Sequence, residues 1–250
     1  VKTHVFHDFG EQAVEFLDYD ASQGETAELT KYAVIYTQRE AAKEALKETI
    51  QKEMKDFLET GFEAEFELHQ NACLSLWREA DIQIDGDEEL NKAIRFNVFH
   101  LMNTASESDS HVNIGAKLLH GEEYGGHAFW DTELFMLPFF AYTFPKKARR
   151  LETYRYHLLD AARGNAAKNG FQGAQYPWES ADDGTEQCPD WTIEPDGTCY
   201  RCYVADYEHH VTAAVAFGIA NYVRITKDTG FLLDMGAEIL METARFWMSR

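Results

Sequence analysis

The spacing of apolar residues along the chain predicts a mainly helical protein with a short β-rich beginning. β-Branched and aromatic residues concentrate in residues 1–9 and 32–36, two strand-length segments separated by a polar stretch. Residues 39–59 are rich in Glu, Lys, Ala and Gln, which favour a helix with acid-base pairs on successive turns. We therefore expect residues 1–37 to be the end of a β-sandwich domain and residues 38–60 to be a helical linker.

After residue 60, apolar residues recur every three or four positions, as they do in amphipathic helices. Asp87 is a predicted N-cap, Pro145 stands at a plausible first helical position, and Gly170 at a plausible stop. Little beyond residue 38 is strand-like. Helices are predicted over residues 62–77, 88–102, 145–170, 204–227 and 231–247.

Two long segments between these helices are not typical of linkers. Residues 106–130 contain a cluster of glycines, and residues 171–203 contain three prolines, two tryptophans and three cysteines. Loops of this length in a compact domain are usually functional or disordered, and aromatic-rich segments are rarely disordered. We therefore expect these two loops to build a site.

Charge and composition narrow the choice of partners. The net charge of −20 at pH 7 repels phosphate backbones and anionic lipid headgroups over about 8 Å at physiological salt, so neither nucleic acid nor a membrane surface is an expected partner. The longest uncharged apolar stretch, residues 134–144, is too short to span a bilayer. The chain begins without a methionine or a signal-peptide pattern, so we expect it to be a piece of a longer, cytoplasmic protein.

Three cysteines gather in the second long loop. Cys199 and Cys202 form a C-x2-C pair, and Cys188 with His209 or His210 could complete four ligands for zinc. The second half of a zinc motif is missing, however, so no metal site is predicted and the thiols are interpreted as ordinary loop residues.

Two strings each place a tryptophan next to a carboxylate: Trp130-Asp131 in the first loop and Trp178-Glu179 in the second. An indole face packs against the apolar face of a pyranose, and a carboxylate accepts hydrogen bonds from neighbouring hydroxyls. The pattern therefore predicts a carbohydrate site. In the alternative interpretation both tryptophans are core residues and Asp131 only caps the helix that follows.

The strings at residues 127–140, 154–163 and 173–180 resemble, in the same order, the central domain of family 65 of the glycoside hydrolases. This resemblance implies that residues 61–250 are the first part of an (α/α)6 barrel. It also implies inverting phosphorolysis of an α-linked disaccharide or glucosyl-polyol to β-glucose 1-phosphate, with inorganic phosphate as co-substrate and no cofactor. Family members are commonly homodimers.

By the same resemblance, Trp130, Asp131, Trp178 and Glu179 hold the transferred glucosyl unit, and His127 and Phe129 shape its pocket. By the same resemblance, the segment Glu208-His209-His210 lies near the acceptor side of the substrate site. In the alternative interpretation it is only the start of a helix, where an acidic side chain is favourable. The general acid of the family is the glutamate of a Pro-Asp-Glu-Tyr string. These 250 residues contain no such string, so no catalytic residue is assigned, the acid is expected beyond Arg250, and the isolated chain is expected to be inactive.

Two other functions fit the same residues. An inverting α-glucoside hydrolase of the trehalase or glucoamylase type would need a second carboxylate to activate water, about 6.5–9.5 Å from the acid. A non-catalytic barrel could keep the tryptophans for sugar binding without the acid. The acceptor, which the loop at residues 182–203 would select, does not follow from the sequence.

Overall fold

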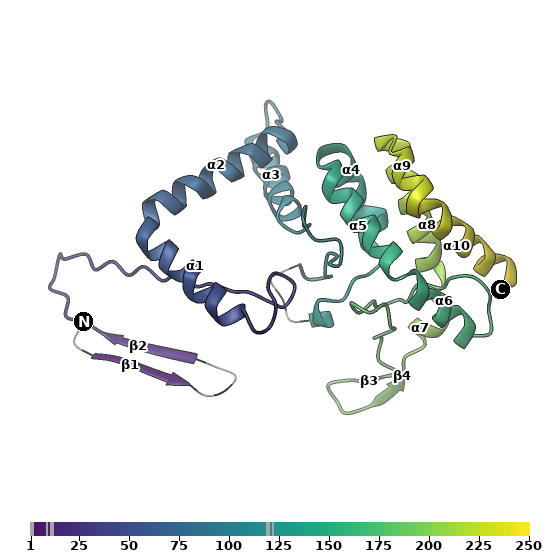
Figure 1. The fold of residues 1–250 in the computed structure, drawn as a ribbon, viewed down its shortest axis with the longest axis horizontal. Helices are drawn as coiled ribbons and strands as arrows, with labels where there is room; N and C mark the ends of the chain where they lie inside the picture. Colours follow the sequence, from purple (N-terminus) through teal and green to yellow (C-terminus); the bar gives the residue numbers. More distant parts are fainter. Residues whose placement is uncertain (1–2, 9, 11–12, 119–120, 122) are drawn as a thin grey trace. The chain divides into compact units, whose positions relative to one another are not determined.

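The structure is a computed structural model that describes residues 3–8, 10, 13–118, 121 and 123–250. The chain divides into two compact units, Val1–Leu74 and Ser75–Arg250 (Figure 1).

The first unit contains a hairpin and polar helices. β1 (Thr3–Asp8) pairs antiparallel with β2 (Ala13–Asp18), so that Thr3 lies opposite Asp18. α1 (Leu46–Thr60) follows a long segment without regular structure, and α2 (Phe62–Ala80) begins after Gly61. Among the described residues of this unit none is buried, and Phe6 and Phe16 are more than half exposed. An isolated two-stranded hairpin is marginally stable, which agrees with its lack of a core.

Two predictions in this unit need correction. Residues 32–36 form no strand, because a strand needs a neighbour to accept its hydrogen bonds and the described residues provide none there. The strand that pairs with β1 is β2, in which only Glu15 separates the apolar residues Val14 and Phe16, and which the sequence pattern did not predict. α1 begins at Leu46 rather than at residue 39. Val1, Lys2 and Phe9, part of the predicted first strand, lie outside the described residues.

The second unit is mostly helical, and α4, α5, α8 and α10 lie side by side in it (Figure 1). A small hairpin, β3 with β4, interrupts the loop before α8, where no strand was predicted. η1 is a 3-10 turn, and η2 and η3 are single turns of π-helix. The elements after α2 are α3 (Glu88–Met102), η1 (Glu123–Gly126), η2 (Thr132–Met136), α4 (Leu137–Thr143), α5 (Pro145–His157), α6 (Leu159–Lys168), β3 (Trp191–Ile193), β4 (Cys199–Arg201), α7 (Val204–Tyr207), α8 (His210–Thr226), α9 (Thr229–Phe231), η3 (Leu232–Gly236) and α10 (Ala237–Ser249).

Local signals placed most of these helices correctly. The Asp87 side chain accepts a hydrogen bond from the N–H of Leu90 at 2.9 Å, which confirms it as the cap of α3. Pro145 is the first residue of α5. The predicted helix over residues 145–170 is divided at Leu158, where ψ is 6° and the chain leaves the helical path between α5 and α6. Similarly, α7 and α8 are separate, with α8 beginning at His210.

The core of the second unit is formed mainly by a large apolar cluster to which the side-by-side helices contribute and which extends into both long loops; Ala80, Val98 and Met102 form a second, smaller cluster. Ala128 of the first loop and Tyr176 of the second are almost fully buried in the large cluster. Because parts of both loops are in the core, the segments between Ala128 and the start of η2, and between Tyr176 and Ser180, have fixed positions. Fully buried members from the helices include Leu137, Phe140, Ala148, Val215, Ile219 and Ile239.

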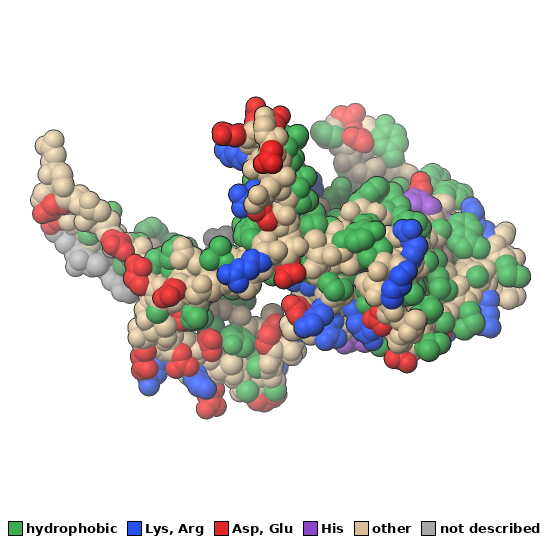
Figure 2. Space-filling model, turned by 90° about the horizontal axis from the view of Figure 1, so that it is seen from above, with side chains coloured by type: hydrophobic (Ala, Val, Ile, Leu, Met, Phe, Trp, Pro, Cys, Tyr) green, Lys and Arg blue, Asp and Glu red, His purple; other side chains and the backbone are tan. Residues whose placement is uncertain are grey.

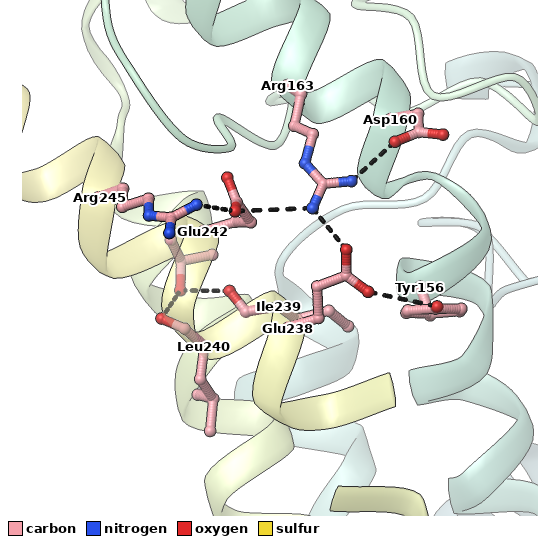
Figure 3. Close-up of polar contacts among 9 residues, drawn as sticks. Tyr156, Asp160, Arg163, Glu238, Ile239, Leu240, Glu242 and Arg245 are labelled. Carbon is pink, nitrogen blue, oxygen red and sulfur yellow. Dashed lines mark hydrogen bonds and ion pairs between the residues drawn. The ribbon is translucent and has the colours of Figure 1, made fainter. Parts of the chain in front are cut away.

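A polar cluster attaches α10 to α5 and α6 (Figure 3). Arg163 donates to Glu238 at 2.6 Å and to Asp160 at 2.8 Å, and its guanidinium lies 3.6 Å from Glu242. The Tyr156 hydroxyl donates to the second oxygen of Glu238 at 3.3 Å. Arg163 therefore links residues from two helices that are about 75 positions apart in the sequence.

The surface agrees with the acidic composition. Acidic side chains are spread over the face in Figure 2, together with many exposed apolar side chains. Within the described part of the chain, no helix is both long enough and apolar enough to cross a bilayer.

Candidate carbohydrate site

One backbone contact joins the two tryptophan-acid strings. The N–H of Ala128 donates to the carbonyl of Ser180 at 3.0 Å, and the N–H of Ser180 donates to the carbonyl of Ala128 at 2.9 Å. Gly115 continues this pairing beyond Ala128, and Glu186 continues it beyond Ser180. Four short segments from the two loops therefore pair in a row through single β-bridges, and the bridge between Ala128 and Ser180 joins the two loops.

The two indoles meet at one histidine. The ring of Trp130 lies 4.8 Å from the ring of His210, and the ring of Trp178 lies 5.7 Å from it, both in edge-to-face geometry. Phe129, which is buried, contacts Trp178 at 6.2 Å. Both indoles pack on the core while part of each remains exposed. The structure therefore brings Trp130 and Trp178 together at the start of α8, with each residue partly exposed.

Two acid-histidine pairs lie beside the indoles. His127 Nδ1 is 2.8 Å from Glu179 Oε1, and this contact joins the two strings a second time. His210 Nδ1 is 3.0 Å from Glu208 Oε2. Glu179 is mostly buried, whereas Glu208 is exposed. The site thus contains two carboxylates that are oriented by imidazoles and can accept hydrogen bonds from sugar hydroxyls.

Asp131 does not cap the helix that follows it. Its own backbone is already helical, at φ −55° and ψ −35°, and its side chain accepts no capping hydrogen bond. Its carboxylate is half-buried, and the first turn after it is the π-helical turn η2. Single π-helical turns are frequent at functional sites. The alternative in which Asp131 serves only as a cap is therefore not what the structure shows.

A buried ion pair holds the backbone of the first string on the core side. Arg155 donates to Glu133 at 2.5 and 3.0 Å, and the same guanidinium donates to the carbonyl of Phe129 at 3.0 Å. Arg155 is fully buried and its neighbour Glu133 is 1% exposed. The Tyr176 hydroxyl donates to the backbone carbonyl of Arg155 at 2.9 Å, and the Arg155 guanidinium lies 5.9 Å from the centre of the Tyr176 ring, so Arg155 also contacts the second string.

Glu152 is a second carboxyl group in the same interior. Both of its oxygens are buried without a hydrogen-bond partner among the described residues. Burial, and next the charge of Glu133, raise the pKa of Glu152 well above its usual range. Gly218 leaves room for these carboxyl groups, because a Cβ there would lie 2.7 Å from Glu152 Oε1. Sequence reasoning missed Glu133, Glu152 and Arg155, because nothing local marks a buried ion pair.

Glu186 supports the second string. Its carboxylate accepts hydrogen bonds from the backbone N–H groups of Trp178 at 2.6 Å, Glu179 at 2.9 Å and Cys188 at 3.0 Å. A polar cavity of about 280 Å³ adjoins this position and is lined by Glu186, Pro177 and Lys168, among others. Glu186 was also missed from the sequence, where it is one acid among many.

His209 is not brought to the indoles. Its ring packs between Phe171 at 5.7 Å and Phe246 at 5.5 Å, and its Nε2 contacts the carbonyl of Asp206 at 2.8 Å. Burial lowers the pKa of His209. The next residue, His210, occupies the position beside Trp130.

The loop cysteines do not form a metal centre. The Sγ atoms of Cys188 and Cys202 lie 3.8 Å apart, and Cys199 is exposed. Burial and hydrogen bonding to Cys202 raise the pKa of Cys188 to about 12. Over the residues for which positions are given, no group of three or more His, Cys, Asp or Glu side chains is arranged to hold a metal ion.

The sequence matches a known family over most of the second unit. Residues 95–250 match the model of the glycosyl hydrolase family 65 central catalytic domain. The kojibiose phosphorylase of Caldanaerobacter subterraneus subsp. tengcongensis is 51% identical over 245 residues, which are 98% of this chain and 32% of the relative. The α,α-trehalose phosphorylase of Thermoanaerobacter brockii is 37% identical over 247 residues, 98% of this chain and 30% of the relative.

A solved structure from the human microbiome, described as a candidate kojibiose phosphorylase, has a similar fold. Its TM-score is 0.73 at 28% identity, and the match covers 83% of this chain and 26% of that chain. The chain thus spans about a third of the length of the curated relatives that it matches.

Proposed function

Because this chain belongs to glycosyl hydrolase family 65, we propose that the protein carrying it cleaves an α-glucoside by inverting phosphorolysis. The substrates are an α-linked disaccharide or glucosyl-polyol and inorganic phosphate, and the products are β-glucose 1-phosphate and the acceptor. The observation that supports this most directly is the meeting of Trp130 and Trp178 at His210, with carboxylates beside both indoles.

In this proposal the glucosyl unit packs on the exposed faces of Trp130 and Trp178. Asp131 and Glu179 accept hydrogen bonds from its hydroxyls, and these bonds strengthen as the oxocarbenium-like transition state develops. His127 orients Glu179 through the 2.8 Å contact. Phe129 closes the base of the pocket because it is buried against Trp178.

The start of α8 forms the acceptor side. Glu208 reaches this side through its contact with His210. His209 does not contact the substrate in this proposal. It supports the acceptor side indirectly, because its packing between Phe171 and Phe246 fixes the first turn of α8. The helices of the second unit are then part of an (α/α)6 barrel, whose loops at one end hold the substrate.

The chemistry follows that of inverting glycosidases with one change. A carboxylic acid protonates the leaving oxygen, and phosphate attacks the anomeric carbon from the opposite face. Phosphate is already an anion at neutral pH, so no general base and no cofactor are needed. The proton donor comes from a part of the full-length protein other than these 250 residues. We place the protein in the cytoplasm, which agrees with four unpaired cysteines, and expect a homodimer.

The first experiment measures turnover by the full-length protein on kojibiose, nigerose, maltose and α,α-trehalose. We expect β-glucose 1-phosphate to form only when phosphate is present. Phosphate-independent release of glucose would indicate a hydrolase instead. Sugar binding without any turnover would indicate a non-catalytic barrel.

The second experiment tests the site. Asp131→Ala in the full-length enzyme should lose about 2–4 kcal/mol of transition-state stabilisation, or roughly 30- to 1000-fold in kcat/KM. The matched control is Asp234→Ala, an exposed aspartate in the other long π-helical turn, η3, which should stay within about twofold of wild type. A kcat/KM for Asp131→Ala within about threefold of wild type would contradict the assignment.

A further inference from the structure

The chain turns back immediately after the second string. The carbonyl of Thr185 accepts a hydrogen bond from the N–H of Ala181 at 3.2 Å, which closes a tight turn. Gly184 in this turn has φ +79°, and a Cβ there would lie 2.8 Å from the Cβ of Ala161 in α6. Both the backbone angle and the close approach require glycine. The chain therefore reverses its direction at this turn, and Glu186 pairs with Ser180 in an antiparallel bridge.

At this position the Glu186 carboxylate meets three backbone N–H groups. Oε2 accepts from Trp178, and Oε1 accepts from both Glu179 and Cys188. Hydrogen bonds to an ionised carboxylate are about twice as strong as bonds between neutral groups. The donors come from both arms of the turn, so the single side chain holds the second string against the returning chain.

The remaining bonds complete the support on both sides of the string. The carbonyl of Glu179 accepts from the N–H of Gln187 at 2.9 Å, and Ser180 pairs with Ala128 of the first string. Without Glu186, the N–H groups of Trp178 and Glu179 would lose their acceptor in a partly buried setting, where an unpaired donor is costly. Their side chains would then no longer be held in one position.

We propose that Glu186 is a positioning residue of the sugar site, which fixes the backbone of Trp178 and Glu179 so that indole and carboxylate bind one glucosyl unit together. Glu186 does not contact the sugar in this arrangement; it acts through the two residues whose N–H groups it holds. The ligand part of the inference rests on the proposed function. The backbone part rests on the three hydrogen bonds alone.

The test is Glu186→Gln in the full-length protein. Glutamine has the same size but replaces one carboxylate oxygen by an NH2 group, which cannot accept from a backbone N–H. Two quantities are measured: the hydrogen-exchange rates of the Trp178 and Glu179 amides, and the Kd for D-glucose by calorimetry. We expect exchange to be about tenfold faster and binding about tenfold weaker. The control is Glu194→Gln, the same change at an exposed residue of the same loop, which should alter neither.

The possible outcomes distinguish the backbone part of the inference from its ligand part. Unchanged amide exchange in Glu186→Gln overturns the positioning role, whatever the affinity. Faster exchange with unchanged glucose affinity also overturns it, because Glu186 would then support only the loop. If the wild-type protein binds no D-glucose, the proposed function fails, and the ligand part of this inference fails with it. Faster exchange together with weaker binding, both absent in the control, supports the proposal.

Discussion

The two tryptophan-acid strings are similar in sequence but are supported in opposite ways. The first, around Trp130, lies above an ion pair between Arg155 and Glu133 that is almost completely buried. The second, around Trp178, is held by the partly buried carboxylate of Glu186 in a loop. The first support belongs to the core and the second to a surface turn. Damage to the first is therefore expected to unfold the unit, whereas damage to the second is expected to disorder only the site.

The largest effect is expected for Arg155→Met. It removes the charge that compensates Glu133 and the donor to Phe129, and it leaves an unpaired buried carboxylate. We expect the free energy of unfolding to fall by about 3–5 kcal/mol, measured by urea denaturation. Arg150→Met in the same helix is the control, because Arg150 is more exposed and makes one bond to a backbone carbonyl. Equal losses of unfolding free energy in Arg155→Met and Arg150→Met would contradict the view that the first string depends on a buried ion pair in the core.

A pair of glycine substitutions tests the same interior. Gly218→Ala places a methyl group 2.7 Å from Glu152 Oε1 and 2.9 Å from Glu133 Cγ, and should cost about 1–3 kcal/mol. Gly164→Ala in α6 meets no atom within 4 Å, and should stabilise the protein by about 0.5–1 kcal/mol. Thermal denaturation of both variants measures whether each substitution stabilises or destabilises the protein. A neutral Gly218→Ala would mean that the interior below the first string can relax.

The pH dependence of stability should reveal Glu152. Its folded pKa is raised above the unfolded value of 4.5 by burial, so above pH 4.5 the unfolded chain releases a proton that the folded protein keeps. This raised pKa therefore contributes stability that is lost as pH rises. Relative to Glu152→Gln, the wild type should lose up to about 1.4 kcal/mol per pH unit, until the folded pKa is reached. Parallel curves for the two proteins between pH 4.5 and 7 would contradict this.

The smallest loss of global stability is expected for Glu186→Gln. Because its hydrogen bonds lie in a surface turn, their loss should lower the free energy of unfolding by only about 1 kcal/mol. The measurement is urea denaturation beside Arg155→Met. A loss as large as that of Arg155→Met would show that the second string, too, depends on the core.

The sequence predicted features that depend on neighbouring residues. The Asp87 cap and the start of α5 at Pro145 are local, and both were found where expected. The strand at residues 32–36 was wrong because strand formation depends on a distant partner, which propensity does not report. The division at Leu158 was missed because residues 145–170 have helical periodicity throughout.

The site could be predicted only in part, for a related reason. The tryptophan-acid strings are visible in the sequence, and the contact of both indoles with His210 agrees with a common site. The supports could not be predicted, because Arg155 and Glu133 are 22 positions apart and become partners only in the folded unit. A one-residue difference separates the predicted His209 from the histidine that reaches the indoles, and sequence gives no helix phase to that precision.

The wide turn after Asp131 also sets the rotational phase of its helix. In η2 (Thr132–Met136) the chain takes a π-helical turn before the α4 residues Leu137 and Phe140 enter the core. A regular α-helix of the same length would rotate Trp130 about the helix axis by about 100° relative to Leu137, because an α-helical turn uses about one residue fewer than a π-helical turn. The extra residue of this turn therefore lets the indole contact His210 of α8 while Leu137 and Phe140 keep their places in the core.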